Sequence, residues 1–449
     1  MKLYNRTDNY ELYHGNMLDM LDVLESNSIG AIVTDPPYGL TSIVKRFGKG
    51  NSAPASTNNN DGSFARLSKG FMGQTWDGSG IEYNVETWKK CYDVLKPGGY
   101  LLAFGGARTF HRIACAIEDA GFEIRDTIMW VYGSGFPKSQ NVGKQVEATL
   151  KYNKSNSRSL RQLEQEEGTN PHTVNQPNNG MMGEKKETVR KDYMPDNKWV
   201  GFGTCLKPAY EPIIVARKPI EGTIAKNCLK YGVGALNIDE CRIPTEDVRK
   251  DGYENREDGS KGTLGWVTKK KTFTEGRFPA NLILTYGEED KEEVIGGFPN
   301  SNGAGGSMPK VKVTGYENGI GNGKNEYDNS ERIPFNSGSG SAARYFYCAK
   351  ASKRDRDEGL EEEGETPRKN IHPTVKPTSL MQYLVRLITP KGSTILDPFM
   401  GSGSTGKAVM YENNDRGANY KFIGIEMTDE YLPIAEARIK YAKEKNETL

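Results

Sequence analysis

The sequence lacks the features of membrane, disulfide-stabilised and metal-binding proteins. No run approaches the roughly 18 apolar residues that a membrane-spanning helix requires, and the polar first ten residues do not have the pattern of a signal peptide. The six cysteines form no C-x-x-C pair and the four histidines are scattered, so we expect neither a disulfide framework nor a metal site. These absences favour a soluble, cytoplasmic protein.

An excess of charge of one sign is also missing. The chain has 60 basic and 59 acidic residues, a net charge of +1. No overall field therefore attracts the protein to nucleic acid, and contacts with a polyanion must come from local patches. Apolar residues are scarce at 35%, and the 51 glycines indicate many loops. With 449 residues, the chain is long enough for about two to four domains, or for one large domain with insertions.

Apolar periodicity is concentrated at the two ends of the chain, where strands and helices alternate. This alternation is typical of an α/β fold with a mostly parallel sheet and helices on both faces. The predicted strands cover residues 10–14, 29–34, 100–104, 123–132, 212–217, 394–397 and 421–426. We therefore expect 1–137 and 346–449 to form two halves of one domain, completed by a core strand within 201–219.

The middle of the chain has weaker periodicity. Residues 138–200 are polar, and we predict a solvent-exposed, partly disordered insertion there. Residues 220–345 offer only short strand candidates among glycine-rich loops. The acidic run 355–365 is most simply a solvated face or a linker.

A glycine-rich turn, Asp397 to Lys407 (DPFMGSGSTGK), follows a predicted strand and opens a helix, where backbone N–H groups and the helix dipole face a ligand. It nearly matches the P-loop pattern, but Ala408 stands where a hydroxyl should hold magnesium. It also matches the dinucleotide pattern G-x-G-x-x-G, with Glu426 placed to bond a ribose. S-adenosylmethionine, which also needs an acidic ribose partner but has no pyrophosphate, is a third candidate. A tight turn without a ligand is the fourth interpretation.

A second turn decides among these interpretations. Residues 35–38, Asp-Pro-Pro-Tyr, end the predicted buried strand 29–34, at the edge where α/β folds place their ligands. A chance match to four fixed residues somewhere in the chain has a probability of roughly 0.3% at average residue usage. A strand-ending turn explains the prolines, but it does not explain a carboxylate and an aromatic ring at this edge.

These motifs resemble those of the amino-methylating DNA methyltransferases of the beta arrangement, most closely the phage-type adenine-N6 members. In that family the Asp-Pro-Pro-Tyr motif comes first, the target-recognition region second and the cofactor motif last, which is the order in this chain. The resemblance covers most of the chain outside 138–200. Further segments that resemble the family are 13–18, 207–217, 277–281, 372–377, 397–406 and 422–426.

The resemblance implies a Rossmann-like methyltransferase fold, S-adenosylmethionine as the cofactor, and a set of site residues. The implied catalytic residues are Asp35, Pro36, Pro37 and Tyr38. The implied cofactor-binding residues are Asn16, Thr374, Lys376, Asp397, Phe399, Gly401, Gly403 and Glu426. Asn16 departs from the family, which usually has an aspartate at this position, so an amide would replace a carboxylate there.

The implied reaction is adenine-N6 methylation without a covalent enzyme intermediate. Hydrogen bonds from the amino group to the Asp35 carboxylate and the Pro36 carbonyl would free the nitrogen lone pair for attack on the sulfonium methyl. The two prolines would preorganise these acceptors. Tyr38 would stack on the flipped base and offset part of the cost of flipping.

The implied substrate is double-stranded DNA, read by a target-recognition region at 220–345 with help from 138–200. Candidate phosphate contacts are Lys269, Lys270, Lys271 and Arg277. A second copy of this chain and a cognate restriction endonuclease are further candidate partners. The alternatives are cytosine-N4 methylation of DNA, methylation of RNA or protein, and a DNA-binding protein that has lost catalysis.

Overall fold

The computed structural model divides the chain into two compact units. Unit 1 contains Met1–Gly133 and Tyr210–Leu449, and unit 2 contains Ser134–Ala209. The structure describes residues 2–38, 80–132, 139–154, 157–166, 172–175, 186–189, 195–244, 276–286, 298, 300–301, 307–313, 325–334, 340–341, 346–348, 354–360 and 370–445. Lys269, Lys270 and Lys271, predicted to contact phosphates, lie outside these residues, as does much of 220–345.

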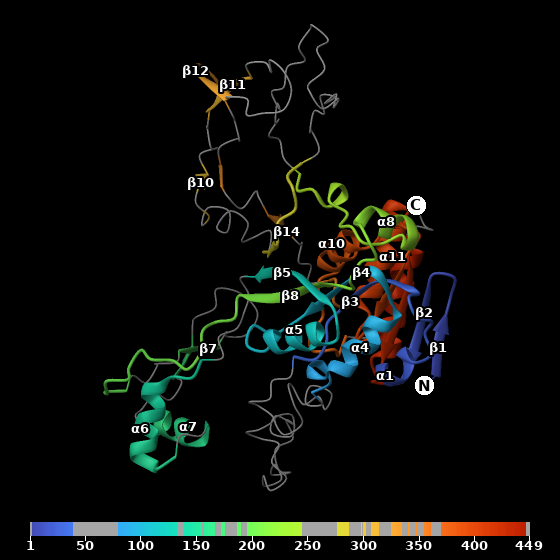
Figure 1. Cartoon of the computed structure of the whole chain (residues 1–449). Coiled ribbons are helices and arrows are strands. Elements are labelled where there is room, and N and C mark those ends of the chain that lie inside the picture. The colour runs from blue at the N-terminus through green and yellow to red at the C-terminus, as the bar shows by residue number, and fades with distance from the viewer. Residues whose placement is uncertain are drawn as a thin grey trace, which may run out of the picture. The chain divides into compact units, whose positions relative to one another are not determined.

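Unit 1 is built on a ten-stranded sheet with the order β1-β2-β16-β15-β3-β4-β8-β5-β9-β14 (Figure 1). Its strands are β1 Lys2–Arg6, β2 Tyr10–His14, β3 Ile29–Thr34, β4 Leu95–Phe104, β5 Glu123–Tyr132, β8 Tyr210–Arg217, β9 Leu282–Thr285, β14 Tyr347–Cys348, β15 Thr394–Asp397 and β16 Lys421–Glu426. The strands from β2 to β4 in this order are parallel to one another, whereas β8 is antiparallel to both of its neighbours. The predicted α/β class with a mostly parallel sheet is confirmed.

Helices cover both faces of this sheet. One core contains residues of α1 (Met17–Leu21), α4 (Val85–Val94) and α5 (Phe110–Asp119). The other core contains residues of α10 (Thr378–Ile388), α11 (Ser404–Arg416) and α12 (Leu432–Glu444). Strand β3 is buried along its whole length, with Ala31 and Val33 in one core and Ile32 in the other. Because both faces of the strand are buried, β3 is an almost continuous apolar run and does not alternate between apolar and polar residues.

The position of the site follows from a reversal of strand order between β15 and β3. The chain leaves β3 for β4 in one direction along the sheet and leaves β15 for β16 in the other. In open α/β sheets such a reversal opens a crevice at the carboxyl ends of the two strands. Asp35 follows β3 and Asp397 ends β15, so both residues lie at this crevice.

One predicted boundary differs in the structure. The sequence favours a turn at residues 96–99 before a strand, but β4 already begins at Leu95. The ladder is extended because Gly98 N donates to the Lys218 carbonyl at 3.0 Å and Lys218 N donates to the Gly99 carbonyl at 2.9 Å. Lys218 follows β8, so the partner strand supplies these hydrogen bonds.

Unit 2 contains helices where the sequence predicts a partly disordered insertion. Helices α6 (Val142–Tyr152) and α7 (Ser157–Glu166) are followed by a short antiparallel pair, β6 (His172–Asn175) and β7 (Lys186–Val189). The Asn141 side chain caps α6 by accepting from Lys144 N at 3.0 Å, and Ala148 and Leu163 are buried. Few apolar residues carry this packing, which explains why the sequence pattern did not reveal it.

The remaining described elements complete the chain. They are the helix α8 (Ile224–Tyr231), the 3-10 turns η3 (Ile81–Tyr83) and η4 (Asp239–Cys241), and two short ladders, β10 (Asn300–Ser301) with β13 (Gly340–Ser341) and β11 (Ser307–Val313) with β12 (Asn325–Pro334). Among the described residues, none of the helices is long and apolar enough to cross a membrane.

Candidate functional site

Three carboxylates lie at the carboxyl edge of the sheet on adjacent strands. Asp35 follows β3, Asp397 is the last residue of β15, and Glu426 is the last residue of β16. Because these strands are parallel neighbours, their carboxyl ends meet at one edge. The structure therefore brings together three acidic residues that the sequence motifs single out.

Asp35 is held by a lysine from the segment before α10. Lys376 Nζ donates to Asp35 Oδ2 at 2.6 Å and lies 3.4 Å from Glu211 Oε2. Lys376 is buried at 5% relative exposure. Asp35 Oδ1 is also buried, and it has no hydrogen-bond partner among the described residues. One carboxylate oxygen thus holds the lysine, while the other can still accept a hydrogen bond.

Burial and charge act in opposite directions on this ion pair. Burial raises the pKa of Asp35, Lys376 lowers it and Glu211 raises it, with a net upward direction. Burial lowers the pKa of Lys376, but Asp35 and Glu211 outweigh burial and raise it to about 12. Lys376 therefore stays protonated as the counter-charge of Asp35 across the neutral pH range.

Glu211 connects this ion pair to Tyr38. Because β8 is antiparallel to β4, its first residues lie at the edge where β4 ends. Glu211 Oε2 accepts from the Tyr38 hydroxyl at 2.7 Å, and Oε1 accepts from the Tyr132 hydroxyl at 3.2 Å. Burial, together with the charges of Asp35 and Glu211, raises the pKa of Tyr38 well above its ordinary value. The hydroxyl of Tyr38 therefore remains a donor that fixes the ring.

The two prolines between Asp35 and Tyr38 are buried. Pro36 and Pro37 each restrict φ to one narrow range, so the backbone of the turn has little freedom. The backbone carbonyl of Tyr38 accepts from the hydroxyls of Tyr83 at 3.0 Å and Thr109 at 2.8 Å. The whole turn is thus fixed both by its own rings and by its neighbours.

Asp397 is a buried carboxylate whose hydrogen bonds come from neutral groups. The hydroxyls of Thr34 and Thr405 donate to it at 2.7 and 2.6 Å, and Phe399 N donates at 3.1 Å. Burial raises the pKa of Asp397 to about 7, although these three hydrogen bonds act to lower it. Asp397 therefore fixes the start of the glycine-rich turn to the neighbouring strand β3.

Glu426 faces the same turn from β16. Its carboxylate accepts from Gly401 N at 2.8 Å and from Thr428 N at 2.7 Å. Burial raises the pKa of Glu426, and the backbone donors lower it in part. Each oxygen keeps a lone pair for a further donor, so Glu426 can still accept hydrogen bonds from a ligand.

Both predicted cofactor glycines adopt backbone conformations that a side chain would disturb. Gly401 has a φ of +54°, and a Cβ there would lie 2.8 Å from His372 Nε2. Gly403 has a φ of +75°, and a Cβ there would lie 2.9 Å from the Ala435 backbone. The turn therefore requires glycine at both positions for packing, independently of any ligand.

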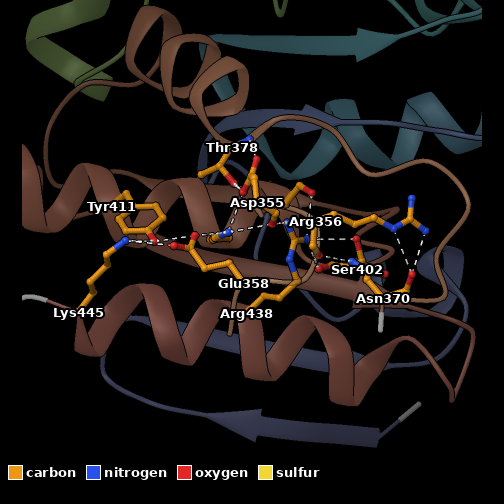
Figure 2. Close-up of polar contacts among 11 residues, drawn as sticks. Asp355, Arg356, Glu358, Asn370, Thr378, Ser402, Tyr411, Arg438 and Lys445 are labelled. Atoms are coloured by element: carbon orange, nitrogen blue, oxygen red, sulfur yellow. Dashed lines mark hydrogen bonds and ion pairs between the residues drawn. The ribbon is translucent and has the colours of Figure 1, made fainter. Parts of the chain in front are cut away.

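The lysine that completes the near-P-loop pattern does not face the turn. Lys407 is fully buried, and its Nζ lies 2.7 Å from Asp355 Oδ1 and 2.8 Å from Glu358 Oε2. Asp355 Oδ2 accepts from Thr378 N at 2.6 Å. Figure 2 shows Asp355 beside Thr378, and Glu358 beside Tyr411. Lys407 is thus occupied by carboxylates and cannot serve a phosphate.

The expectation of a solvated linker at 355–365 is wrong for its described part, 355–360. Asp355 and Glu358 bind Lys407, and Leu360 is buried at 4% relative exposure. Arg438, which is fully buried, donates to the Ser402 carbonyl at 2.7 Å and to the Asp355 carbonyl at 3.3 Å. This segment therefore packs behind the glycine-rich turn, because buried cations on α11 and α12 require acidic partners (Figure 2).

The other implied cofactor residues have protein partners in the structure. The exposed Asn16 caps α1, and its Oδ1 accepts from Leu18 N at 3.0 Å. Thr374 is exposed, and its carbonyl lies 3.0 Å from His372 Nδ1. Burial lowers the pKa of His372 to about 4, so this imidazole is neutral and donates from Nδ1. Phe399 is partly buried against the core that contains α1, α4 and α5.

A family model for DNA methylases matches residues 29–437 of this chain. The chain belongs to this family of N6/N4 DNA methylases. The match includes the Asp-Pro-Pro-Tyr turn at 35–38, β8, the segment before α10 and the glycine-rich turn. It therefore covers the residues of the site described above except Asn16 and Leu18, which precede it, and Arg438, which follows it.

Curated relatives of this DNA methylase are Type II methyltransferases. M.HindIII of Haemophilus influenzae is 26% identical over 245 residues, which cover 50% of this chain and 64% of the relative. M.HpaI of Haemophilus parainfluenzae is 29% identical over 140 residues, 31% of this chain and 37% of the relative. The chain thus spans less than two thirds of the length of these relatives.

Solved structures were also found for comparison. The complex of M1.HpyAVI with SAM has a TM-score of 0.34 and 14% identity, covering 96% of this chain and 98% of that chain. The PvuII DNA methyltransferase, described as cytosine-N4-specific, has a TM-score of 0.39 and 13% identity, covering 97% of this chain and 90% of that chain.

Glu211 of this DNA methylase lies in segment 207–217, but its role cannot be predicted from the sequence. A carboxylate at the start of a buried strand could have indicated it. Such a residue reaches this edge of the sheet only if its strand runs antiparallel to its neighbours, as β8 does. Among the described residues, no group of three His, Cys, Asp or Glu side chains is arranged to hold a metal ion.

Proposed function

We propose that this protein transfers a methyl group from S-adenosylmethionine to the N6 amino group of a flipped adenine in double-stranded DNA. The observation that carries the proposal is the state of Asp35. Its Oδ2 is fixed by Lys376, whereas its buried Oδ1 has no partner among the described residues. A buried acceptor of this kind is costly unless a donor reaches it, and an exocyclic amino group is such a donor.

The residues around the glycine-rich turn fit a cofactor that has a ribose and no phosphate, because the protein offers a carboxylate there and no free lysine in the turn. Glu426 presents a carboxylate at the end of β16, where ribose hydroxyls can donate to it. Lys407, the lysine of the near-P-loop pattern, is held by Asp355 and Glu358 and so is not available to a phosphate. Asn16, Thr374, Phe399, Gly401 and Gly403 would line the same pocket. The cofactor would supply a methyl group on a positively charged sulfur.

The protein groups prepare the amino nitrogen for methylation. Asp35 and the Pro36 carbonyl would accept hydrogen bonds from its two N–H groups, which localises the lone pair that is otherwise delocalised into the ring, and one of the two protons leaves after the methyl group has bound. The prolines hold both acceptors in place before the base arrives, so little reorganisation is needed. Tyr38, fixed through its hydroxyl by Glu211, offers its ring face to the flipped base.

The preference for adenine rests on the aspartate at the first position of the turn. In the family that the sequence resembles, members with Asp there mostly methylate adenine and members with Ser mostly methylate cytosine. Cytosine also carries an exocyclic amino group, so the same site could serve it. The test therefore has to identify the modified base.

The substrate and partners follow the same proposal. Residues 1–137 and 346–449, with the β8 segment 201–219, would form the methyltransferase domain. Residues 220–345, helped by 138–200, would read the DNA sequence. A cognate restriction endonuclease and a second copy of this chain are proposed partners, and the Type II relatives favour the former.

Base-resolution sequencing of methylated DNA tests the proposal. Unmethylated genomic DNA would be incubated with S-adenosylmethionine and the wild type, Asp35→Ala or Asp119→Ala. Asp119 is exposed at the end of α5, away from the site, and serves as the matched control. We expect N6-methyladenine in one short motif with the wild type and Asp119→Ala only. N4-methylcytosine alone would overturn the assignment of the base, and no methylation by the wild type would overturn DNA as the substrate.

A further inference from the structure

Lys376 is unusual because it is a buried cation shared by two carboxylates from different parts of the chain. Asp35 follows β3, Glu211 begins β8, and Lys376 comes from the segment before α10. The Lys376 ammonium also lies 5.0 Å from the centroid of the Phe104 ring and 5.4 Å from that of Tyr38. All of these partners of Lys376 lie within the site, so its ammonium group is held there and does not reach the surface.

The contacts divide the Asp35 carboxylate into two oxygens with different tasks. Oδ2 takes the 2.6 Å hydrogen bond from Lys376. Oδ1 takes none among the described residues. A carboxylate held at one oxygen by a fixed cation cannot rotate freely, so the orientation of its other oxygen is also fixed.

Glu211 has the corresponding relation to Tyr38. Its Oε2 accepts from the Tyr38 hydroxyl at 2.7 Å and lies 3.4 Å from Lys376 Nζ. Its Oε1 accepts from the Tyr132 hydroxyl at 3.2 Å. Glu211 thus joins the carboxylate and the aromatic ring of the catalytic turn through one lysine and one hydrogen bond.

We propose that Lys376 and Glu211 are positioning residues for methyl transfer: Lys376 anchors Asp35 through one oxygen, and Glu211 anchors Tyr38 and balances the charge of Lys376. The inference rests on the proposed function, since it assigns roles around the same Asp35. It gives Lys376 a task at the reacting carboxylate, rather than at the cofactor.

The charged and titratable groups that face Asp35 come from several elements. Lys376, Glu211 and the Tyr38 hydroxyl act on the pKa of Asp35, and the hydroxyls of Tyr38 and Tyr132 donate to Glu211. Asp397 at the end of β15 is a further acidic neighbour, whose pKa is raised in part by the Asp35 charge. Lys376 is a cation that lowers the pKa of Asp35, and Glu211 is a carboxylate that raises it.

The two variants Lys376→Met and Glu211→Gln should therefore move the acid limb of the pH–rate profile in opposite directions. The ionised carboxylate of Asp35 is the stronger acceptor for an amino group, so activity falls as the pH falls through the pKa of Asp35. Removing Lys376 removes the cation that lowers this pKa, and the acid limb moves to higher pH, by about one to three units. Removing the charge of Glu211 moves the limb to lower pH.

The experiment measures kcat/KM for methyl transfer to DNA against pH, which reports groups of the free enzyme. Lys218→Met is the matched control, because Lys218 is also buried, at 8% relative exposure, but binds Asn27 and the carbonyls of Tyr92 and Leu95. We expect Lys218→Met to lower stability and leave the acid limb in place. Lys376→Arg keeps the cation, and its acid limb should stay near that of the wild type even where the rate falls.

A merely structural role predicts a different pattern. Lys376→Met and Glu211→Gln would then lower activity by a constant factor at every pH and leave the acid limb in place, as we expect for Lys218→Met. This result would overturn the proposal. If the wild type methylates no DNA, the proposed function fails, and the titration of Asp35 still tests the inference. Infrared difference spectra follow the carboxylate band of Asp35, which is identified by its loss in Asp35→Asn. The pH midpoint of this band should be higher in Lys376→Met and lower in Glu211→Gln than in the wild type. Unchanged midpoints would overturn the inference.

Discussion

Two buried lysines in unit 1 differ in whether the protein satisfies the carboxylates around them. Lys376 binds Asp35 and Glu211 at the edge of the sheet, and one Asp35 oxygen is left without a partner among the described residues. Lys407 binds Asp355 and Glu358 behind the glycine-rich turn. There both oxygens of Asp355 are used, one by Lys407 and the other by Thr378.

The difference separates a reactive ion pair from a structural one. Buried polar groups in proteins are normally satisfied, so a saturated cluster such as that of Lys407 needs no ligand to explain it. An unsatisfied buried acceptor costs free energy unless a donor reaches it. The free oxygen of Asp35 therefore fits the role proposed for the Lys376 cluster, whereas the Lys407 cluster holds the turn against α11 and α12.

The largest expected effect is a loss of activity when Asp35 of the Lys376 cluster is changed. Asp35→Asn keeps the size of the side chain but removes the charge that accepts the amino hydrogens. We expect the rate of methyl transfer to fall by at least about 100-fold, the lower end for the loss of one preorganised hydrogen-bonding group at a reacting centre. Glu211 remains as a counter-charge for Lys376, so the urea midpoint of unfolding should fall less than in Lys407→Met. Labelled methyl transfer at saturating DNA, with unfolding followed by fluorescence, measures both quantities.

The opposite pattern is expected at the saturated cluster. Lys407→Met leaves Asp355 without its cation and leaves Glu358 with Lys445 alone, and removing one partner of a buried ion pair costs about 3 kcal/mol of unfolding free energy. Activity per folded molecule should fall far less than in Asp35→Asn. Lys440→Met, at an exposed lysine of α12, is the control and should be neutral. An unfolding midpoint equal to that of the wild type would show that Lys407 has no structural role.

The sequence predicts the site residues whose place depends only on the order and direction of the strands. Asp35, Asp397 and Glu426 each end an apolar strand, and parallel strands bring such residues to one edge. The contact between Asp35 and Lys376 could not be predicted, because the two residues are 341 positions apart and the contact depends on how the segment before α10 crosses the site. Glu211 needed the direction of β8.

Local composition hides the structure of two polar segments. Residues 355–360 are acidic and would be solvated alone, but Lys407 and Arg438 are buried and need them. The helices α6 and α7 of unit 2 bury few side chains, so their sequence has too weak a pattern to separate them from an insertion. In both places, tertiary contacts decide the structure of a polar segment.

A third buried carboxylate sharpens the comparison, because Asp397 has hydrogen bonds but no lysine. Its pKa is about 7, raised by burial, so the folded state binds this proton more tightly than the unfolded state does. The contribution of Asp397 to the free energy of unfolding therefore falls as the pH rises from about 4 to about 7 and is constant above that range. Urea midpoints at pH 5 and pH 8 should show a smaller fall in Asp397→Asn than in the wild type.

Two companion variants define what that measurement means. Asp119→Asn, at an exposed carboxylate, should keep the pH dependence of the wild type. Thr405→Val removes one donor to Asp397 and should cost about 1 kcal/mol. An equal fall from pH 5 to pH 8 in Asp397→Asn and the wild type would show that Asp397 is ionised at both values, which contradicts the assigned pKa.

The smallest expected effect concerns Asn16, whose side chain, like that of Lys407, is occupied by the protein itself. Its Oδ1 caps α1, and an aspartate can cap a helix equally well, so Asn16→Asp should leave stability unchanged. Asn16→Ala should lower it by about 1 kcal/mol. Calorimetric titration with S-adenosylmethionine separates the two roles of this residue. A Kd that is the same in Asn16→Ala and the wild type means that the cap is its whole role, whereas a weaker Kd means that the amide also reaches the cofactor, as the resemblance implies.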